Sequence, residues 1–213
     1  MAGHRREFDS SLDRIEAKVI ELFAMIAEDL PAAARCLLDD SGETARTLAE
    51  REQLINALYV EIENLASREI VLQAPVASDL RYLLTVLRVV PELERSHDLV
   101  ISIASRAGHI PAADLSPAIL DLTAQMAGLA ARMWQQAADA RYDRDRTAAT
   151  ALSEHDMQMD LLDTRLTAEI TAPHMPVCSA MDMALTARDY ERLGAHAVNI
   201  TRRITYLAGR AES

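Results

Sequence analysis

The sequence predicts an all-α protein built from two tandem three-helix bundles. Three observations carry this prediction. The chain of 213 residues is 50% hydrophobic but only 4% aromatic, and its Val, Ile and aromatic residues are too thinly spread for a chain of short strands. Apolar residues recur at spacings of three and four, which is the helical period. Six glycines and seven prolines are few, and they divide the chain into long segments.

The first predicted helix covers residues 7–38. Its apolar stripe follows the helical spacing and consists of Phe8, Leu12, Ile15, Val19, Leu22, Ile26 and Leu30. Pro31 is expected to kink this helix or to end it early, because proline lacks the N–H that a helix interior needs. A turn at 39–42 precedes the second predicted helix, 43–72, which contains neither proline nor glycine.

The third predicted helix follows a break at residues 73–79 and reaches Arg106. Ser78 or Asp79 is expected to cap its first turn, since short polar side chains accept hydrogen bonds from the free N–H groups there. Pro91 lies inside this helix and is expected to bend it.

The second half of the chain repeats this layout. Its predicted helices are 119–142, 147–170 and 178–207, with an interruption at 172–176. The turn-rich stretch 108–117 separates the halves. Three long helices, a central turn and three more indicate an internal duplication. Short connections make neighbouring helices antiparallel, so we expect one bundle in residues 1–110 and a second in 111–213.

Individual residues also match between the halves. Glu94-Arg95 in the third helix corresponds to Glu191-Arg192 in the sixth. Glu52 in the second helix corresponds to Asp156 in the fifth. The correspondence extends to chemically distinctive residues, which supports a duplication and not merely two sets of helices.

The formal net charge of −11 argues against direct nucleic-acid binding. A phosphate backbone repels an acidic surface unless a basic patch is segregated from it, and no such patch appears along the sequence. Lys18 is the only lysine, and no glycine-rich loop precedes it. A Walker-type phosphate loop is therefore excluded.

The chain has the features of a soluble cytoplasmic protein. Cys36 and Cys178 lie far apart and neither belongs to a CxxC pair, which is typical of reduced thiols. The N-terminal residues lack the apolar core of a signal peptide. No apolar run approaches the ~20 residues that a membrane span requires.

Acidic side chains interrupt the apolar pattern of the third helix. The helical steps between Val90 and Ile101 fall on Glu94 and Asp98, and residues four apart lie on one face of a helix. An uncompensated carboxylate pair on a buried stripe is costly or is forced neutral. Such a pair needs a cation, an arginine partner or an edge location.

Each half offers three acids, distributed over four analogous places, as candidate metal ligands: Glu52, Glu94 and Asp98 in the first half, and Asp156, Asp160 and Glu191 in the second. Carboxylates on facing helices bind multivalent cations through oxygen. Asn56 could add a carbonyl oxygen in the first half, whereas Ala195, four residues after Glu191, has no ligand atom. Alternatively, the acids pair with the neighbouring arginines, which are Arg51, Arg88, Arg95, Arg188 and Arg192.

The sequence contains no catalytic constellation. It has no HExxH motif and no G-x-S-x-G elbow. A ferritin-like di-metal enzyme needs two Glu-x-x-His motifs, but Glu94-x-x-His97 is the only one, and Gly194 takes the place of the second histidine. We therefore predict a non-enzyme. Two alternatives remain: a carboxylate-bridged metal protein of the storage or di-iron type, and a purely structural interaction bundle without metal.

Two motifs resemble those of a known family. The run Gln73-Ala74-Pro75-Val76-Ala77-Ser78-Asp79-Leu80-Arg81, followed by Leu93-Glu94-Arg95-Ser96-His97-Asp98, resembles the "QxPVAxDLR … LERIGD" signature of PhoU proteins, which regulate bacterial phosphate uptake and signalling. Tyr190-Glu191-Arg192-Leu193-Gly194-Ala195-His196-Ala197-Val198-Asn199-Ile200 looks like that family's second copy, "ERIGDHAxNI". The resemblance spans nearly the whole chain.

The resemblance implies two three-helix bundles in tandem and no catalytic activity. It implies a cytoplasmic regulator that works beside the phosphate ABC transporter ATPase and its sensor histidine kinase, and that represses the phosphate-starvation response when phosphate is plentiful. A homodimer is also compatible with the resemblance.

The resemblance also implies metal on E/DxxxD motifs, with an ion of the iron, zinc, magnesium or manganese type. Those motifs correspond to Glu94/Asp98, Asp156/Asp160, Glu191 and Glu52 of this chain. Asn56 and Ala195 stand where the family has acids, so we expect weaker binding than is usual, with the second site the poorer one. His97 departs from the family's glycine and would either add a nitrogen ligand or face solvent.

Overall fold

The computed structural model describes residues 2–39, 42–143, 147–171 and 175–210 of the chain. These residues form six long helices and no strand: α1 (Ala2–Asp39), α2 (Gly42–Gln73), α3 (Ala77–Ala107), α4 (Pro117–Asp143), α5 (Ala148–Ile170) and α6 (Val177–Arg210). A short 3-10 turn, η1 (Ala112–Asp114), lies between α3 and α4. The all-α prediction is confirmed. None of the described helices combines the length and the apolar character that crossing a bilayer requires.

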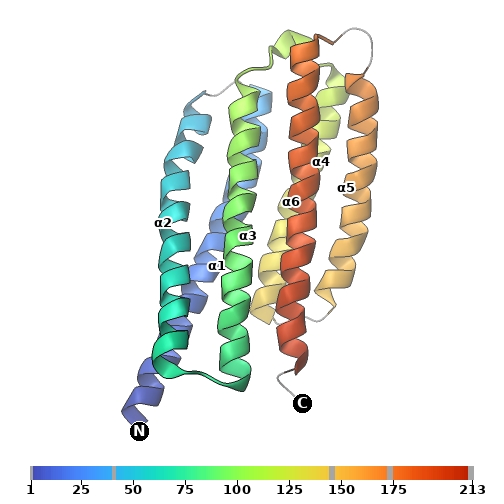
Figure 1. Cartoon of the computed structure of the whole chain (residues 1–213). Coiled ribbons are helices and arrows are strands. Elements are labelled where there is room, and N and C mark those ends of the chain that lie inside the picture. Colours follow the sequence, from blue (N-terminus) through green and yellow to red (C-terminus); the bar gives the residue numbers. More distant parts are fainter. Residues whose placement is uncertain (1, 40–41, 144–146, 172–174, 211–213) are drawn as a thin grey trace.

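The helices lie in two layers (Figure 1). The order α2, α3, α6, α5 makes up one layer, and α1 and α4 lie behind it. Within each half the three helices contact one another, and the halves join where α3 packs against α6 and α1 packs against α4. The predicted division at residue 110 falls between α3 and η1. It stays a prediction, because the halves also share one continuous apolar core.

The core follows the apolar stripe predicted for α1. Ile15, Leu22 and Leu30 are fully buried, and Leu12 packs against the core while half-buried. Phe23 of α1 and Trp134 of α4 meet across the two halves with ring centroids 6.0 Å apart. This contact buries two of the chain's few aromatic rings where the halves join.

The prolines inside α1 and α3 do not end these helices. Pro31 lies within α1, which continues to Asp39, so an early end was wrong. The helix persists because Leu30 and Ala33 on either side are fully buried, and their packing offsets the missing backbone hydrogen bond. α3 likewise runs through Pro91.

The start of α3 differs from the sequence prediction. Val76 is the N-cap residue, and no side chain caps the helix, so capping by Ser78 or Asp79 was wrong. Asp79 instead accepts a hydrogen bond from Arg5 of α1 at 3.2 Å. Ala74 and Ala77 adopt φ values of 43° and 50°, in the left-handed region that a Cβ disfavours. This turn is therefore locally strained.

Two equivalent ion pairs connect α3 and α6, one on each side of the centre of their contact. Arg106 pairs with Asp189 at 2.6 Å, and Arg203 pairs with Glu92 at 3.3 Å. Arg106 and Arg203 occupy equivalent positions in the two halves, and so do Glu92 and Asp189. Each ion pair is therefore the counterpart of the other. The pairing also shows that α3 and α6 are antiparallel. The halves are thus related by an approximate two-fold axis that crosses the seam.

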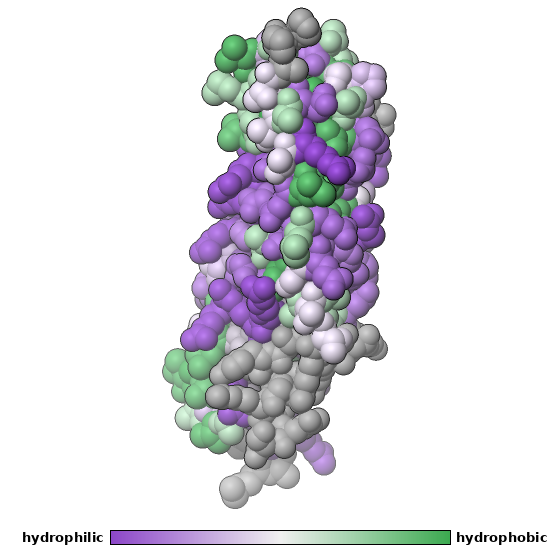
Figure 2. All heavy atoms as spheres, turned by 90° about the vertical axis from the view of Figure 1, so that its right-hand side faces the viewer, coloured by the Kyte–Doolittle hydropathy of each residue, from purple (hydrophilic) through white to green (hydrophobic). Residues whose placement is uncertain are grey.

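Exposed apolar side chains are distributed unevenly over the surface. Figure 2 shows the α5 side, where hydrophilic residues dominate the middle and hydrophobic residues gather toward both ends, including the end at which α6 begins. The exposed apolar residues of α6 there are Val177, Met181 and Leu185.

Candidate functional site

The first carboxylate cluster lies where α2 packs beside α3. Burial raises the pKa of the Glu94 carboxyl above its usual range, and the nearby carboxylates of Asp98 and Glu52 raise it further, while Arg95 opposes the shift. The three acids predicted for the first half therefore interact with one another across two helices. Asn56, the fourth residue considered there, is exposed on α2.

These acids border the core and do not lie on its buried stripe. Leu83, Val90, Leu93 and Val100 are among the buried positions of α3. Glu94 is half-buried beside them and Asp98 is exposed. The predicted stripe was misplaced by about one residue, and one residue rotates a helix face by about 100°. Its edge position lets Asp98 keep contact with water, which lowers the cost of its charge.

The second cluster lies between α5 and α6. Burial raises the pKa of Glu191, and Asp160, Asp163 and Asp156 raise it further. Burial also raises the pKa of Asp156, with Asp160 adding to the shift. The cluster thus holds the three predicted acids and a fourth, Asp163.

One arginine approaches this second cluster without neutralising it. Arg188 Nε lies 3.6 Å from Glu191 Oε2, and its side chain is 70% exposed. An exposed pair of that length contributes little, which explains why the pKa of Glu191 is raised although a cation is near. Glu191 Oε2 is buried and has no hydrogen-bond partner among the described residues.

The other arginines do not pair with the candidate acids. Arg51 turns to Glu28 and Asp29, each at 3.1 Å. Within the described ranges, three make no ion pair with any carboxylate: Arg88, Arg95 and Arg192. Among the described residues, an ion pair with one of the five arginines is therefore found for Glu191, while Arg95 and Arg202 act on Glu94 and Asp156 through their charge.

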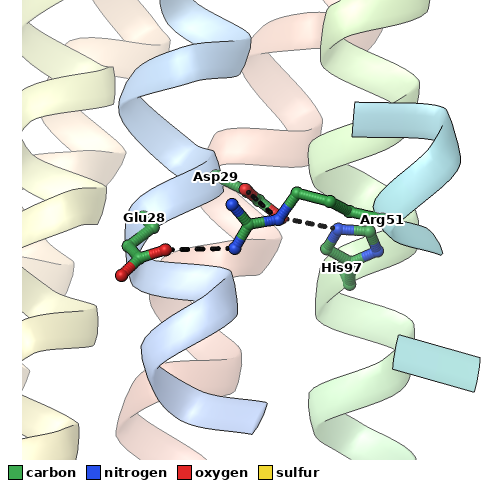
Figure 3. Close-up of polar contacts among 4 residues, drawn as sticks. All are labelled: Glu28, Asp29, Arg51 and His97. Atoms are coloured by element: carbon green, nitrogen blue, oxygen red, sulfur yellow. Dashed lines mark hydrogen bonds and ion pairs between the residues drawn. The ribbon is translucent and has the colours of Figure 1, made fainter. Parts of the chain in front are cut away.

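A buried charge network lies beside the first cluster and links three helices (Figure 3). Asp29 of α1 is 2% exposed. Its Oδ2 lies 3.1 Å from His97 Nε2 of α3, and its Oδ1 lies 3.1 Å from Arg51 Nε of α2. Arg51 Nε makes no aligned hydrogen bond among the described residues. Arg51 and Asp29 therefore attract each other as an ion pair and are not joined by a hydrogen bond at this atom.

The expectation that His97 would face solvent was wrong, because its side chain is buried. Its Nε2 lies beside Asp29, and its role as a metal ligand stays a prediction. Its Nδ1 has no partner among the residues described. The sequence did contain a signal for this network. Asp29 falls between Ile26 and Leu30, on the apolar stripe of α1, where a carboxylate requires a buried partner.

Among the residues described in the second half, no such network is found. Met133 of α4 and Gly194 of α6 occupy the positions equivalent to Asp29 and His97. A Cβ added to Gly194 would lie 3.4 Å from Met133 Sδ and 3.6 Å from Asp156 Oδ1. Glycine thus lets the methionine and the acidic cluster approach the helix backbone. It also leaves the second bundle without the histidine that a di-metal enzyme would need.

The donor atoms of both clusters suit a hard cation. Their oxygens repel one another and are partly removed from water, so an ion would relieve an unfavourable arrangement. In the described part of the chain, however, no three His, Cys, Asp or Glu side chains already converge on one point. A metal at either cluster would have to draw these side chains together.

Comparison with known proteins identifies the family. The family model described as PhoU domain matches residues 19–107 and 123–204. The phosphate-specific transport system accessory protein PhoU homolog of Synechocystis sp. is 30% identical over 95% of this chain and 92% of its own length. The protein of the same name from Zymomonas mobilis is 28% identical over 97% of this chain and 89% of its own length.

Two solved structures share the fold. PhoU from Pseudomonas aeruginosa is 23% identical, with a TM-score of 0.87 over 94% of this chain and 98% of that one. The phosphate transport system regulatory protein PhoU from Streptococcus pneumoniae is 23% identical, with a TM-score of 0.85 over 94% and 96%. The fold is therefore that of two PhoU crystal structures. Since the domain model matches each half of the duplicated chain, this protein belongs to the PhoU family.

Proposed function

We propose that this protein is a non-enzymatic accessory regulator of phosphate transport. The observation that carries the proposal is the match of the PhoU domain model to both halves of the chain. Relatives that are similar over nearly their full length bear the name of phosphate-specific transport system accessory proteins. A shared fold alone would not support a function, but similarity over two complete domains does.

The protein acts, in this proposal, by contact with other proteins. Its partners are the phosphate ABC transporter ATPase and the sensor histidine kinase, and it works in the cytoplasm. It represses the phosphate-starvation response when phosphate is plentiful. The exposed apolar residues Val177, Met181 and Leu185 on α6 support a role in protein contact, because clustered exposed apolar surface favours association.

A deletion strain tests this role. Loss of the protein should derepress phosphate-uptake genes in cells grown with ample phosphate, and the wild-type chain supplied in trans should restore repression. Transporter transcripts and phosphate uptake are measured in both media. Unchanged expression in the deletion strain, with no second copy of the gene, would contradict the proposal.

A second test addresses the absence of enzymatic activity. The purified chain is incubated with ATP or a phosphate monoester, and released phosphate is followed. We expect no turnover, because the sequence offers no phosphate loop and no nucleophile paired with a base. Sustained turnover that a point mutation in this chain abolishes would overturn the proposal.

The two carboxylate clusters are proposed to bind a multivalent cation of the iron, zinc, magnesium or manganese type. Glu52, Glu94 and Asp98 would supply oxygen ligands in the first bundle. Asp156, Asp160 and Glu191 would do so in the second. The pKa values of Glu94 and Glu191 are raised by burial and further by neighbouring carboxylates, and this supports the proposal, since a nearby cation favours the charged form of both groups.

Metal content of matched variants tests the assignment. Asp98→Ala should lower metal stoichiometry at the first bundle, and Ala195→Asp should raise it at the second, because each added carboxylate strengthens attraction for a hard cation. Asp121→Ala, on an exposed position of α4, is the control and should change nothing. If Asp98→Ala keeps all its metal or Ala195→Asp gains none, these acids are not ligands.

A further inference from the structure

Besides Arg203, which pairs with Glu92, four exposed arginines lie on the face formed by α3 and α6, in a chain of net charge −11. Arg88 and Arg95 lie two turns apart on α3, and Arg188 and Arg192 lie one turn apart on α6. Residues at these spacings point to the same side of a helix. Only Arg188 has a carboxylate partner among the described residues, at 3.6 Å. We call these four residues the arginine face.

The tertiary structure brings the two pairs together. α3 and α6 are antiparallel and meet at Ser96 Oγ and His196 Nδ1, which lie 2.9 Å apart. Burial lowers the pKa of His196, and Glu92 opposes this shift, while Arg192 and Arg95 reinforce it. Both guanidinium groups therefore lie within electrostatic range of one imidazole, on either side of the seam.

Acidic residues border the arginine face on both sides. Glu94 interacts with Glu52 of α2 on one side, and Glu191 interacts with Asp160 of α5 on the other. The basic strip is therefore only two helices wide, and packed helix axes lie about 8–10 Å apart. A bilayer or a nucleic-acid duplex laid on this face would also meet the flanking acids. A single helix, about 10–12 Å across, would meet mainly the arginines.

Apolar side chains continue the strip. Leu84 is 40% exposed one turn before Arg88, and Met181 and Leu185 are 61% and 49% exposed before Arg188. Hydrophobic residues gather at this end of α6 in Figure 2. Arginine combined with large apolar residues is typical of protein interfaces, whereas purely ionic surfaces are typical of rims.

We propose that the arginine face binds one amphipathic helix of a protein partner. Acidic side chains of that helix pair with the four arginines, and its apolar side chains cover Met181 and Leu185. Opposite charges speed the encounter and orient the helix. The identity of the partner rests on the proposed function, but the chemistry that this face recognises does not.

Binding of the full chain to its proposed partners tests the inference. The variant Arg95→Glu/Arg192→Glu is compared with Arg132→Glu/Arg165→Glu, a control with the same charge change on exposed residues of α4 and α5. The probes are the purified transporter ATPase and the detergent-solubilised sensor kinase. At about 50 mM salt, the first variant should bind at least one of them about tenfold more weakly than wild type, and the control should differ by less than about twofold.

The possible outcomes distinguish the inference from the proposed function. If wild type and Arg95→Glu/Arg192→Glu bind equally well, the inference is wrong while the proposed function stands. If wild type binds neither protein, the proposed partners are wrong, and a second probe tests the arginine face alone. That probe is a labelled helical peptide of Glu and Leu, compared with phosphatidylglycerol vesicles and a DNA duplex.

With this second probe, wild type should bind the acidic peptide, and Arg95→Glu/Arg192→Glu should lose about tenfold in affinity. Equal binding of the peptide by the two arginine variants would overturn the inference. Binding of vesicles or DNA in preference to the peptide would overturn it as well. Circular dichroism of all variants confirms that they are folded.

Discussion

Replacing Asp29 by alanine measures what the buried charge network contributes to stability. Asp29 is 2% exposed and its two carboxylate oxygens each have a cationic or polar partner at 3.1 Å, Arg51 and His97. The substitution removes the carboxylate that both Arg51 and His97 contact. Arg51 keeps Glu28 at 3.1 Å and is 29% exposed, so it is rescued in part by water and by a second acid.

The expected loss follows from these contacts. Breaking a buried ion pair by removing one partner costs about 3–5 kcal/mol. Because Arg51 keeps a second acid and partial contact with water, we expect the low end, about 3 kcal/mol. For a chain of this size each kcal/mol lowers Tm by about 2–4 °C, so the melting temperature should fall by about 6–12 °C.

The second bundle supplies the matched comparison. There Met133 packs against Gly194 at the equivalent positions. Well-packed apolar residues often replace a buried ion pair at little cost. The double variant Asp29→Met/His97→Gly should therefore be more stable than Asp29→Ala by about 1–2 kcal/mol, even though glycine inside a helix costs about 1 kcal/mol.

Urea unfolding at about pH 7 is followed by circular dichroism and by the fluorescence of the single tryptophan. Coincidence of the two curves checks that the halves unfold together. Asp13→Ala, at an exposed position of α1, is the control and should change stability by less than about 0.5 kcal/mol. A loss below about 1 kcal/mol for Asp29→Ala, or a double variant less stable than the single one, would refute the reasoning.

Three further predictions concern the contacts described above. Trp134→Phe should lower stability by about 1–2 kcal/mol in urea unfolding, because it removes the hydrogen bond from Nε1 to Leu193 O at 3.1 Å and part of a fully buried side chain; an unchanged midpoint would contradict this. Arg106→Ala and Asp189→Ala, combined in a double-mutant cycle, should show a coupling of about 1–2 kcal/mol across the seam; additive losses would mean that the ion pair does not hold the halves together. The pKa of Glu191 is raised in the folded chain, so its protonated form stabilises the fold below the unfolded pKa, and that stability is lost as pH rises through the folded pKa. Without multivalent cations, Glu191→Gln should thus be more stable than wild type at about pH 8, with the difference shrinking toward about pH 4; a variant less stable at high pH would count against the repulsion described here.

The sequence by itself determined the helices and their duplication. Apolar spacing and the scarcity of glycine and proline predicted all six elements, because both are local properties of a helix. It also placed the candidate acids at four analogous places of the two halves, because the i, i+4 relation needs only the helical period. The cap of α3 was missed, since Ala74 and Ala77 take left-handed backbone angles that no local signal indicates.

Tertiary packing decided which chemistry these helices present. Asp29 and His97 lie 68 residues apart in the chain and touch only because α1 packs against α3. The acids border the core because the buried face of α3 is set by its neighbours, α1, α2 and α6. The arginine face exists only where α3 and α6 meet, so a basic strip forms in a chain whose sequence shows arginines interleaved with acids. Charge along a sequence is averaged over all faces of a helix, whereas packing selects one face and places it beside another.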